Sequence, residues 1–422
     1  MEERLAPKRN FYLVCLTLIS FGLVASRRPD ALFHPQFFAE DGVIFYQQAF
    51  NTGWLKALET PVAGYYDTIS RLVAAVSMAF PIWAAPPIFN VAAIAIQISP
   101  VWFFNTSRFD GLIPDGRMRL LLSFLYLGLP NSLEIDANLT NALWHMALLG
   151  GMVILAPQSP GFLWKAFDLI VLAISGLSGP FCLLLFPSAA LAWFYTWRRW
   201  SLVLLGLNIL TAVIQVITLI SVTGMKTRSP APLGVGPVTF SRILGGQVFL
   251  GAILGQNGYS FVYQQPWWNA GVAAPLLITA AGLLVMAYVA WKSNLVMRLF
   301  MLYSALAFLG ALASPMASGT DPQWPLLVRP GVGARYYFLP MLAWVVSLAW
   351  LVWPNRRRIL SVLGAGALAV MIVVGIPIDW NFPAFTDLQF STHAVQFDHA
   401  APGSDVSIPI NPTGWTMVLH KR

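Results

Sequence analysis

The sequence predicts an all-α polytopic membrane protein with about 11 to 13 transmembrane helices and a small β-rich segment at its C-terminal end. Hydrophobic residues make up 57% of the 422 residues and charged residues only 10%, and the mean hydropathy is +0.67. Such a composition is far more apolar than that of a soluble domain. Apolar blocks of roughly membrane length also recur along the chain. The predicted spans lie near 11–26, 67–84, 87–105, 119–131, 141–157, 163–178, 180–197, 201–222, 271–291, 297–314, 336–353 and 359–377.

The first apolar block follows a basic N-terminal segment, so a secretory signal peptide is the competing interpretation. Arg27 and Arg28 follow Ala25-Ser26 directly, where a signal peptide would carry its small-residue cleavage site. This arrangement favours an uncleaved first span.

Basic clusters between the apolar blocks set the predicted orientation, because cytoplasmic loops are enriched in Lys and Arg. These clusters are Lys8-Arg9, Arg198-Arg199, Lys292 with Arg298, and Arg356-Arg357-Arg358. The rule places the N-terminus inside and the loops 27–66, 131–140, 223–270 and 315–335 outside, together with the segment 378–422. One conflict remains. The loop that carries Arg108, Arg117 and Arg119 belongs inside, yet two full spans between 67 and 105 would put it outside, so one of those two blocks is re-entrant or lies along the membrane interface.

The C-terminal segment 378–422 differs in character from the rest of the chain. Apolar and polar residues alternate in Val395-Gln396-Phe397-Asp398 and in Val406-Ser407-Ile408-Pro409-Ile410, with Pro402-Gly403 between them. This pattern predicts short strands and turns, and therefore a small β-rich appendage on the outer face.

The acidic pair Glu40-Asp41 lies in the first predicted outer loop and is the strongest candidate for chemistry. Phe37, Phe38 and other bulky residues flank it, which indicates a segment that lies at the membrane surface and presents a carboxylate inward. Adjacent residues on a helix point about 100° apart, so only one carboxylate aims squarely at a substrate. We favour Asp41, because Gly42 beside it allows close approach of a backbone or ligand, and keep Glu40 as the alternative.

A second polar group runs from residue 131 to residue 145. Glu134, Asn138, Asn141 and His145 are spaced four, three and four residues apart, and would share one face of a helix, with Trp144 beside them. Such a stripe usually faces a cavity or a neighbouring helix, because it is costly in lipid. We predict that these five residues line a substrate cavity. A hydrogen-bonded seam between helices is the alternative, and a histidine such as His145 is by itself more often a satisfied core residue.

Arg335 opens the predicted span at 336–353, between a glycine-rich stretch and Tyr336. An arginine at a membrane boundary can simply extend its charged end to the lipid headgroups. Its planar guanidinium also matches the oxygens of a lipid-borne phosphate, and on this second interpretation Arg335 and Tyr336 form a donor-phosphate site.

In these features the chain resembles the GT-C class of membrane glycosyltransferases, which use lipid-linked sugar donors. The resemblance rests on the many spans, the acidic pair Glu40-Asp41 in the first outer loop, the Arg335-Tyr336-Tyr337 boundary and the outer C-terminal piece. It implies that residues 1–377 form a glycosyltransferase-like membrane domain, that 378–422 form a small extracytoplasmic segment, and that Asp41 or Glu40 is the catalytic base. The C-terminal piece is much smaller than in the larger members of the class, which puts acceptor recognition in doubt.

The predicted function is inverting transfer of a sugar from a polyprenyl-phosphate-linked donor to a glycan, lipid or protein acceptor, at the outer face of a bacterial cytoplasmic (inner) membrane. A transporter or flippase of a lipid-linked saccharide is the alternative, and a non-catalytic subunit of polysaccharide assembly is a third possibility. No nucleotide-binding P-loop, metalloprotease or serine-hydrolase motif is present.

The predicted partners are the lipid-linked donor, the acceptor and membrane lipids. Nucleic acid is not among them, because the net charge of +8 comes mainly from the short basic clusters between spans. Cys15 and Cys182, the only two cysteines, lie in apolar blocks and have no ligand-like spacing, so we predict neither disulfides nor a zinc site. No cofactor is predicted, and a divalent cation remains open.

Overall fold

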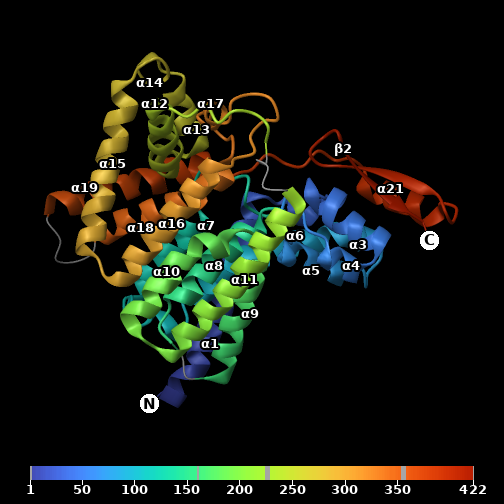
Figure 1. The fold of residues 1–422 in the computed structure, drawn as a ribbon, viewed down its shortest axis with the longest axis horizontal. Helices are drawn as coiled ribbons and strands as arrows, with labels where there is room; N and C mark the ends of the chain where they lie inside the picture. The colour runs from blue at the N-terminus through green and yellow to red at the C-terminus, as the bar shows by residue number, and fades with distance from the viewer. Residues whose placement is uncertain (1, 159–160, 224–228, 353–357, 422) are drawn as a thin grey trace.

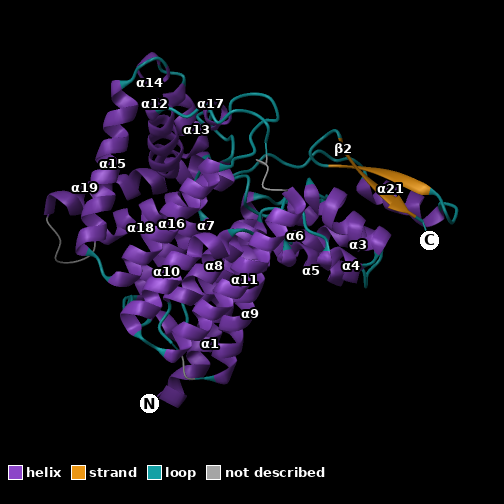
Figure 2. Cartoon of the chain, viewed as in Figure 1, coloured by secondary structure: helices purple, strands orange, loops and turns teal. Residues whose placement is uncertain are grey.

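The computed structural model describes residues 2–158, 161–223, 229–352 and 358–421, and it is mostly helical (Figures 1 and 2). Within these ranges, 8 helical stretches are long and apolar enough to cross a membrane. They are Lys8–Arg27, Ile82–Phe104, Arg199–Val222, Pro237–Tyr263, Ala273–Lys292, Leu295–Ala313, Ala334–Val352 and Arg358–Ile378. A helical, multi-pass membrane protein is thereby supported, although fewer stretches qualify than the 11 to 13 predicted. Three further apolar helices are shorter: Thr68–Ser77, Ala142–Leu155 and Phe181–Thr196.

The first long helix leads into a set of short helices on the side of the molecule away from the N-terminus (Figure 1). The first long helix is α1 (Glu2–Arg27). The short elements that follow it are α2 (Asp30–Phe33), η1 (Asp41–Tyr46), α3 (Gln47–Thr52), α4 (Trp54–Glu59), α5 (Thr68–Ser77) and η2 (Ile82–Ala84), and they lead to the long helix α6 (Ala85–Phe104). Helix α5 has 10 residues. At 1.5 Å per residue it is about 15 Å long, half the thickness of a bilayer core. The span predicted at 67–84 is therefore wrong, because a loop and η2 interrupt the block.

The short α5 resolves the conflict over the basic loop after α6. With one span fewer, α1 and α6 bring Arg108 and Arg119 back to the end of the bundle that holds the N-terminus. Side-chain contacts place them there: Arg9, near the start of α1, donates to Asp110 at 2.7 Å, and Arg119 also pairs with Asp110. At the opposite end of α1, Arg27 donates to the carbonyl oxygen of Leu127 at 2.6 Å.

The middle of the chain forms a group of neighbouring helices. They are η3 (Ser107–Phe109), α7 (Gly116–Leu127), α8 (Ala142–Leu155), α9 (Phe162–Ser178), α10 (Phe181–Thr196) and α11 (Arg199–Thr223). Small residues let these helices approach closely. A Cβ atom at Gly150 would lie 2.6 Å from the Ser175 hydroxyl, and one at Gly176 would lie 2.4 Å from the Thr211 hydroxyl. Close packing through small residues is the usual way in which helices associate in lipid.

A helical stretch that folds back on itself occupies part of the region 223–270, which the sequence analysis assigned to an outer loop. It consists of α12 (Pro237–Ser241), η4 (Arg242–Leu250) and α13 (Gly251–Tyr263). The backbone breaks at Gly255, with φ of 78°. The Tyr259 hydroxyl then lies 3.5 Å from the carbonyl oxygen of Arg242, two residues that a straight helix would separate by about 25 Å. This stretch contains many glycines and polar side chains, so its sequence does not form a continuous apolar block.

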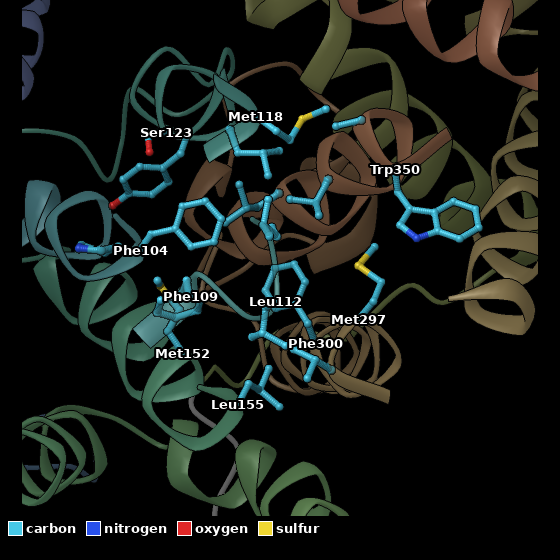
Figure 3. A pocket seen from close by; sticks show the side chains of 18 of the residues that line it. Phe104, Phe109, Leu112, Met118, Ser123, Met152, Leu155, Met297, Phe300 and Trp350 are labelled. Carbon is cyan, nitrogen blue, oxygen red and sulfur yellow. The ribbon is translucent and has the colours of Figure 1, made fainter. Parts of the chain in front are cut away.

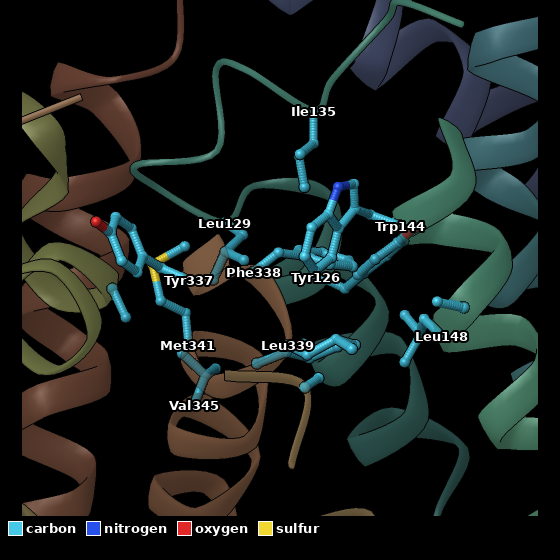
Figure 4. Close-up of a cluster of buried hydrophobic side chains, with 14 of the residues drawn as sticks. Tyr126, Leu129, Ile135, Trp144, Leu148, Tyr337, Phe338, Leu339, Met341 and Val345 are labelled. Carbon is cyan, nitrogen blue, oxygen red and sulfur yellow. The ribbon is translucent and has the colours of Figure 1, made fainter. Parts of the chain in front are cut away.

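The remaining membrane-length helices, and the short elements between them, complete the bundle. The elements are α14 (Pro266–Asn269), α15 (Ala273–Lys292), α16 (Leu295–Ala313), α17 (Gln323–Leu327), η5 (Ala334–Tyr337), α18 (Phe338–Val352), α19 (Arg358–Val370), η6 (Met371–Gly375) and α20 (Ile376–Ile378). Of the basic cluster at 356–358, Arg356 and Arg357 lie outside the described residues. The buried start of α18 packs with Tyr126, Trp144 and Leu148 in the apolar core beneath the loop that connects α7 to α8 (Figure 4).

The C-terminal segment is one helix and one hairpin rather than strands alone. Helix α21 (Phe390–His399) contains residues 395–398, for which we predicted a strand, whereas 406–410 do form a strand. Strands β1 (Asp405–Ile410) and β2 (Trp415–His420) pair antiparallel, with Asp405 opposite His420. The hairpin packs on α3, where the Asn51 side chain donates to the Val418 carbonyl and accepts from the His420 N–H, both at 2.9 Å.

Candidate functional site

The acidic pair lies at the start of η1, beyond the end of α1 and outside the long apolar stretches. Asp41 is completely buried, and its two carboxylate oxygens accept hydrogen bonds from the Thr140 hydroxyl at 2.7 Å and the Leu139 N–H at 3.2 Å. Glu40 beside it is only half-buried. Burial raises the pKa of Asp41 to about 7, although these hydrogen bonds act in the opposite direction. The side chain is therefore poised to gain or lose a proton near neutral pH.

The C-terminal hairpin fixes the local backbone of this pair. Ala39 has a positive φ of 48°, and its N–H donates to the carbonyl oxygen of Asn411, next to β1. A Cβ atom at Gly42 would lie 2.6 Å from the Ile410 side chain, so only glycine fits there without rearrangement. We expected Gly42 to permit a close approach, and the group that approaches it is Ile410 of the protein itself.

The loop between α7 and α8 contacts Asp41, and it is not helical. Residues 131–141 form turns, with positive φ at Asn131 and Ala137, and α8 begins only at Ala142. The prediction that Glu134, Asn138, Asn141 and His145 share one helical face is therefore wrong, because the first three lie in this loop. Here they hold the loop together: the side-chain amides of Asn138 and Asn141 both donate to the carbonyl oxygen of Glu134 at 2.8 Å.

Glu134 and Arg335, which we predicted for different parts of a site, form an ion pair. The Arg335 guanidinium contacts one carboxylate oxygen of Glu134, and the Arg335 N–H donates to the other at 3.0 Å. The guanidinium also donates to the Met316 carbonyl at 3.2 Å and to the Tyr336 hydroxyl at 3.0 Å. Its side chain is 28% exposed and that of Glu134 is 23% exposed. The loop 131–141 thus contacts Asp41 near one end and Arg335 near the other.

Trp144 and His145 are buried at the start of α8. The Trp144 ring packs against Phe181 with centroids 4.7 Å apart and against Tyr336 at 6.2 Å. The two nitrogens of His145 lie 2.9 Å from the Tyr126 hydroxyl and 3.1 Å from the Ile135 carbonyl oxygen. The histidine thus has a partner for each nitrogen, as a core histidine does.

Buried charges at the end of α1 were not among the predicted site residues. Arg27 is 1% exposed and forms an ion pair with Asp136 at 3.1 Å. It also donates to the backbone carbonyl of Asp379, whose carboxylate in turn accepts the N–H of Asn131 at 3.0 Å. The sequence did carry a signal for this network, because two adjacent arginines at the end of an apolar block need partners once they are buried.

Two cavities lie away from Asp41, Glu134 and Arg335. A mostly apolar cavity of about 550 Å³ opens between α6, α7, α16 and α18, toward the N-terminal end of the bundle, and its lining includes Phe109, Met297 and Trp350 (Figure 3). A second cavity, of about 370 Å³, lies between α3, η2 and α21 and includes Tyr46 and Asp398. Neither is lined by Asp41, Glu134 or Arg335.

Comparison with known proteins adds no assignment. No protein-family model matches this chain, and no curated protein matches it. Among the described residues, no three His, Cys, Asp or Glu side chains are grouped so that they could hold a metal ion.

Proposed function

We propose that this protein is a membrane glycosyltransferase that moves a sugar from a polyprenyl-phosphate donor to a hydroxyl-bearing acceptor, at the membrane face opposite the N-terminus. The observation that carries the proposal is Asp41, a buried carboxylate whose pKa is raised to about 7, beside a bundle of membrane-length helices. A general base works best when its pKa is near the working pH.

In the proposed reaction, Asp41 takes the proton of the acceptor hydroxyl while the acceptor oxygen attacks the anomeric carbon. The bond between that carbon and the phosphate oxygen breaks, and the lipid phosphate leaves with the electron pair. A single displacement inverts the anomeric configuration. Because Asp41 is buried, the proton is relayed by Thr140, a half-buried residue whose hydroxyl donates to Asp41. The Thr140 oxygen accepts the proton of the acceptor hydroxyl while the proton of its own hydroxyl moves to Asp41.

Arg335 is the proposed partner of the leaving phosphate. Its guanidinium is partly exposed and planar, and such a group can bind phosphate oxygens in pairs. Glu134 holds it in place, and the phosphate would share it with that carboxylate. The loop 131–141 supports this division of roles, because it contacts both Asp41 and Arg335.

The test is sugar transfer from radiolabelled polyprenyl-phosphate sugars in membranes that contain matched amounts of each variant. Asp41→Asn is expected to lower the transfer rate by about 10²- to 10⁴-fold, because it removes the base. Arg335→Ala is expected to lower it as well, and Glu40→Gln to change it less than Asp41→Asn does. Undiminished transfer in all three variants would refute the assignment of the site.

A transporter or flippase of a lipid-linked saccharide is the second candidate, and the folded-back stretch 237–263 favours it. Broken helices that line a substrate path are common in transporters, and the break at Gly255 lies against the carboxylate of Asp379. Movement of a labelled polyprenyl-phosphate sugar across proteoliposomes, without transfer to any acceptor in a panel, would support this candidate over the first.

A further inference from the structure

Arg28 is a buried arginine, and two of its guanidinium nitrogens have no hydrogen-bond partner among the described residues. Its side chain is 6% exposed, and neither Nε nor Nη1 has a partner among the groups that the structure describes. Arg27 provides the comparison within the same chain: it is 1% exposed and its Nε also lacks a partner, yet its terminal nitrogens pair with Asp136 and donate to the carbonyl of Leu127. A buried charge is normally paired, because removing it from water is costly. Arg28 therefore lacks the compensation that its neighbour has.

Aromatic rings surround this guanidinium. It lies 4.7 Å from the ring centroid of Phe385 and 5.5 Å from that of Phe382. Ring faces attract a cation, but they accept none of the hydrogen bonds that a guanidinium offers. Burial lowers the pKa of Arg28, while Asp30 and Asp136 at longer range act against that change. The arrangement suits a cation that receives its acceptor oxygens from a bound anion.

Arg28 lies close to the acidic pair. Phe385, which packs on Arg28, stacks on Phe38 with ring centroids 5.9 Å apart, and the carbonyl oxygen of Phe38 accepts the Asp41 N–H at 3.0 Å. The residues that cover Arg28 come from the connection between α20 and α21, in which Asn381, Pro383 and Ala384 are exposed. The guanidinium is thus just below the surface, and two ring contacts and a backbone hydrogen bond connect it to the segment that carries Asp41.

We propose that Arg28 anchors the phosphate group of an anionic ligand at this site. A guanidinium fork matches two phosphate oxygens at once, and the rings of Phe382 and Phe385 lie against this one. The inference rests on the proposed function for the identity of the ligand, a lipid-borne phosphate, and it adds a second phosphate-binding group to Arg335. The phosphate chemistry would be shared by a free phosphate ion.

The experiment measures ligand binding and thermal unfolding of the purified protein in nanodiscs of zwitterionic lipid, with polyprenyl phosphate and inorganic phosphate as probes. Arg28→Met is expected to bind polyprenyl phosphate about 30-fold more weakly than the wild type, or worse. Without ligand, its unfolding temperature is expected to equal or exceed that of the wild type, because an unpaired buried charge has been removed. Arg27→Met is the matched control and is expected to unfold at a lower temperature, because it leaves Asp136 unpaired.

Binding by Arg28→Met within about threefold of the wild type would overturn the proposal. A fall in its unfolding temperature as large as that of Arg27→Met would overturn it too, because Arg28 would then be a structural residue. Competition by inorganic phosphate would assign the site to phosphate in general, and binding of the lipid alone would assign it to lipid-borne phosphate; either supports the inference. The probe carries no sugar and none is transferred in this assay, so its outcome is separate from that of the transfer test.

Discussion

At the scale of single residues, Asp41 shows how burial prepares a carboxylate for proton transfer. Its side chain reaches no solvent, and two hydrogen bonds from the neighbouring loop offset only part of the cost of charging it. The sequence offered Glu40-Asp41 and Arg335 as candidates for the site, and their role stays a prediction. The sequence could not reveal that Glu134 pairs with Arg335, or that Arg27 pairs with Asp136, because these partners are far apart along the chain and no local pattern links them.

The raised pKa of Asp41 predicts how transfer depends on pH. With a pKa of about 7, the base is protonated and inactive in acid, so the transfer rate should rise about tenfold per pH unit below 7 and level off above it. The measurement is the initial rate of sugar transfer between pH 5 and 9, with Glu40→Gln as the comparison. A flat profile over this range would argue that Asp41 is not the base.

The same shift has a consequence for folding stability. Because the pKa is raised from 3.8 to about 7, the folded state binds a proton that the unfolded state has released between these values. The stabilising contribution of protonated Asp41 to the free energy of unfolding is fully present below pH 3.8. It is lost as the pH rises through 7, by an amount on the order of 4 kcal/mol. Asp41→Asn should therefore gain stability relative to the wild type as the pH rises from 5 to 8, as measured by thermal unfolding. A difference in unfolding temperature between the two proteins that does not change with pH would contradict the raised pKa of Asp41.

At the scale of elements, most predicted spans correspond to helices, and the exceptions have definite causes. The block at 67–84 failed because apolar composition does not reveal the break after the ten-residue α5. The stretch 237–263 was missed because it is packed within the protein, where glycine and polar residues are acceptable. The loop 131–141 looked helical by spacing, yet the positive φ values at Asn131 and Ala137 exclude a helix. Spacing alone cannot report such turns.

The break in α13 predicts a marked cost for any side chain at Gly255. Its φ of 78° is unfavourable for other residues, and an added Cβ would lie 2.6 Å from the carboxylate of Asp379. Gly255→Ala should destabilise the protein by about 1–3 kcal/mol or more, measured as a lower unfolding temperature. Gly366→Ala is the matched control: this glycine lies inside α19 with open space around it, and alanine there should be neutral or mildly stabilising. Equal effects of the two substitutions would contradict this view of the kink.

At the scale of the whole molecule, the structure separates a helical bundle from a group of short elements beside it, formed by α2 to α5, α21 and the hairpin (Figure 1). The contacts of Arg9 with Asp110 and of Arg27 with Leu127 identify the two ends of the bundle. Composition and hydropathy were sufficient to predict a helical, multi-pass protein, and the membrane-length helices support that class. They could not establish how the C-terminal residues close over the first loop, because that packing depends on pairs such as Gly42 with Ile410.

These two ends predict the topology. A cysteine at Gly111, an exposed position in the loop after α6, and a cysteine at Ala401, exposed between α21 and β1, should lie on opposite sides of the membrane. Each is introduced into a variant in which Cys15 and Cys182 are replaced, and is labelled with a membrane-impermeant maleimide in right-side-out and inside-out vesicles. Opposite patterns of labelling are expected at the two positions. Identical patterns would show that the chain crosses the membrane an even number of times between the two positions, which would contradict the predicted topology.

The attachment of β1 and β2 to the first loop has a consequence for biogenesis. Asn51 and Val418, which are hydrogen-bonded, are 367 residues apart, and Ile410 fills the space beside Gly42. During synthesis, the segment that carries Glu40 and Asp41 is made long before β1 and β2, which pack on it. We expect a chain that is released before residue 405 has been added to lack both strands, and its acidic pair to remain without that packing.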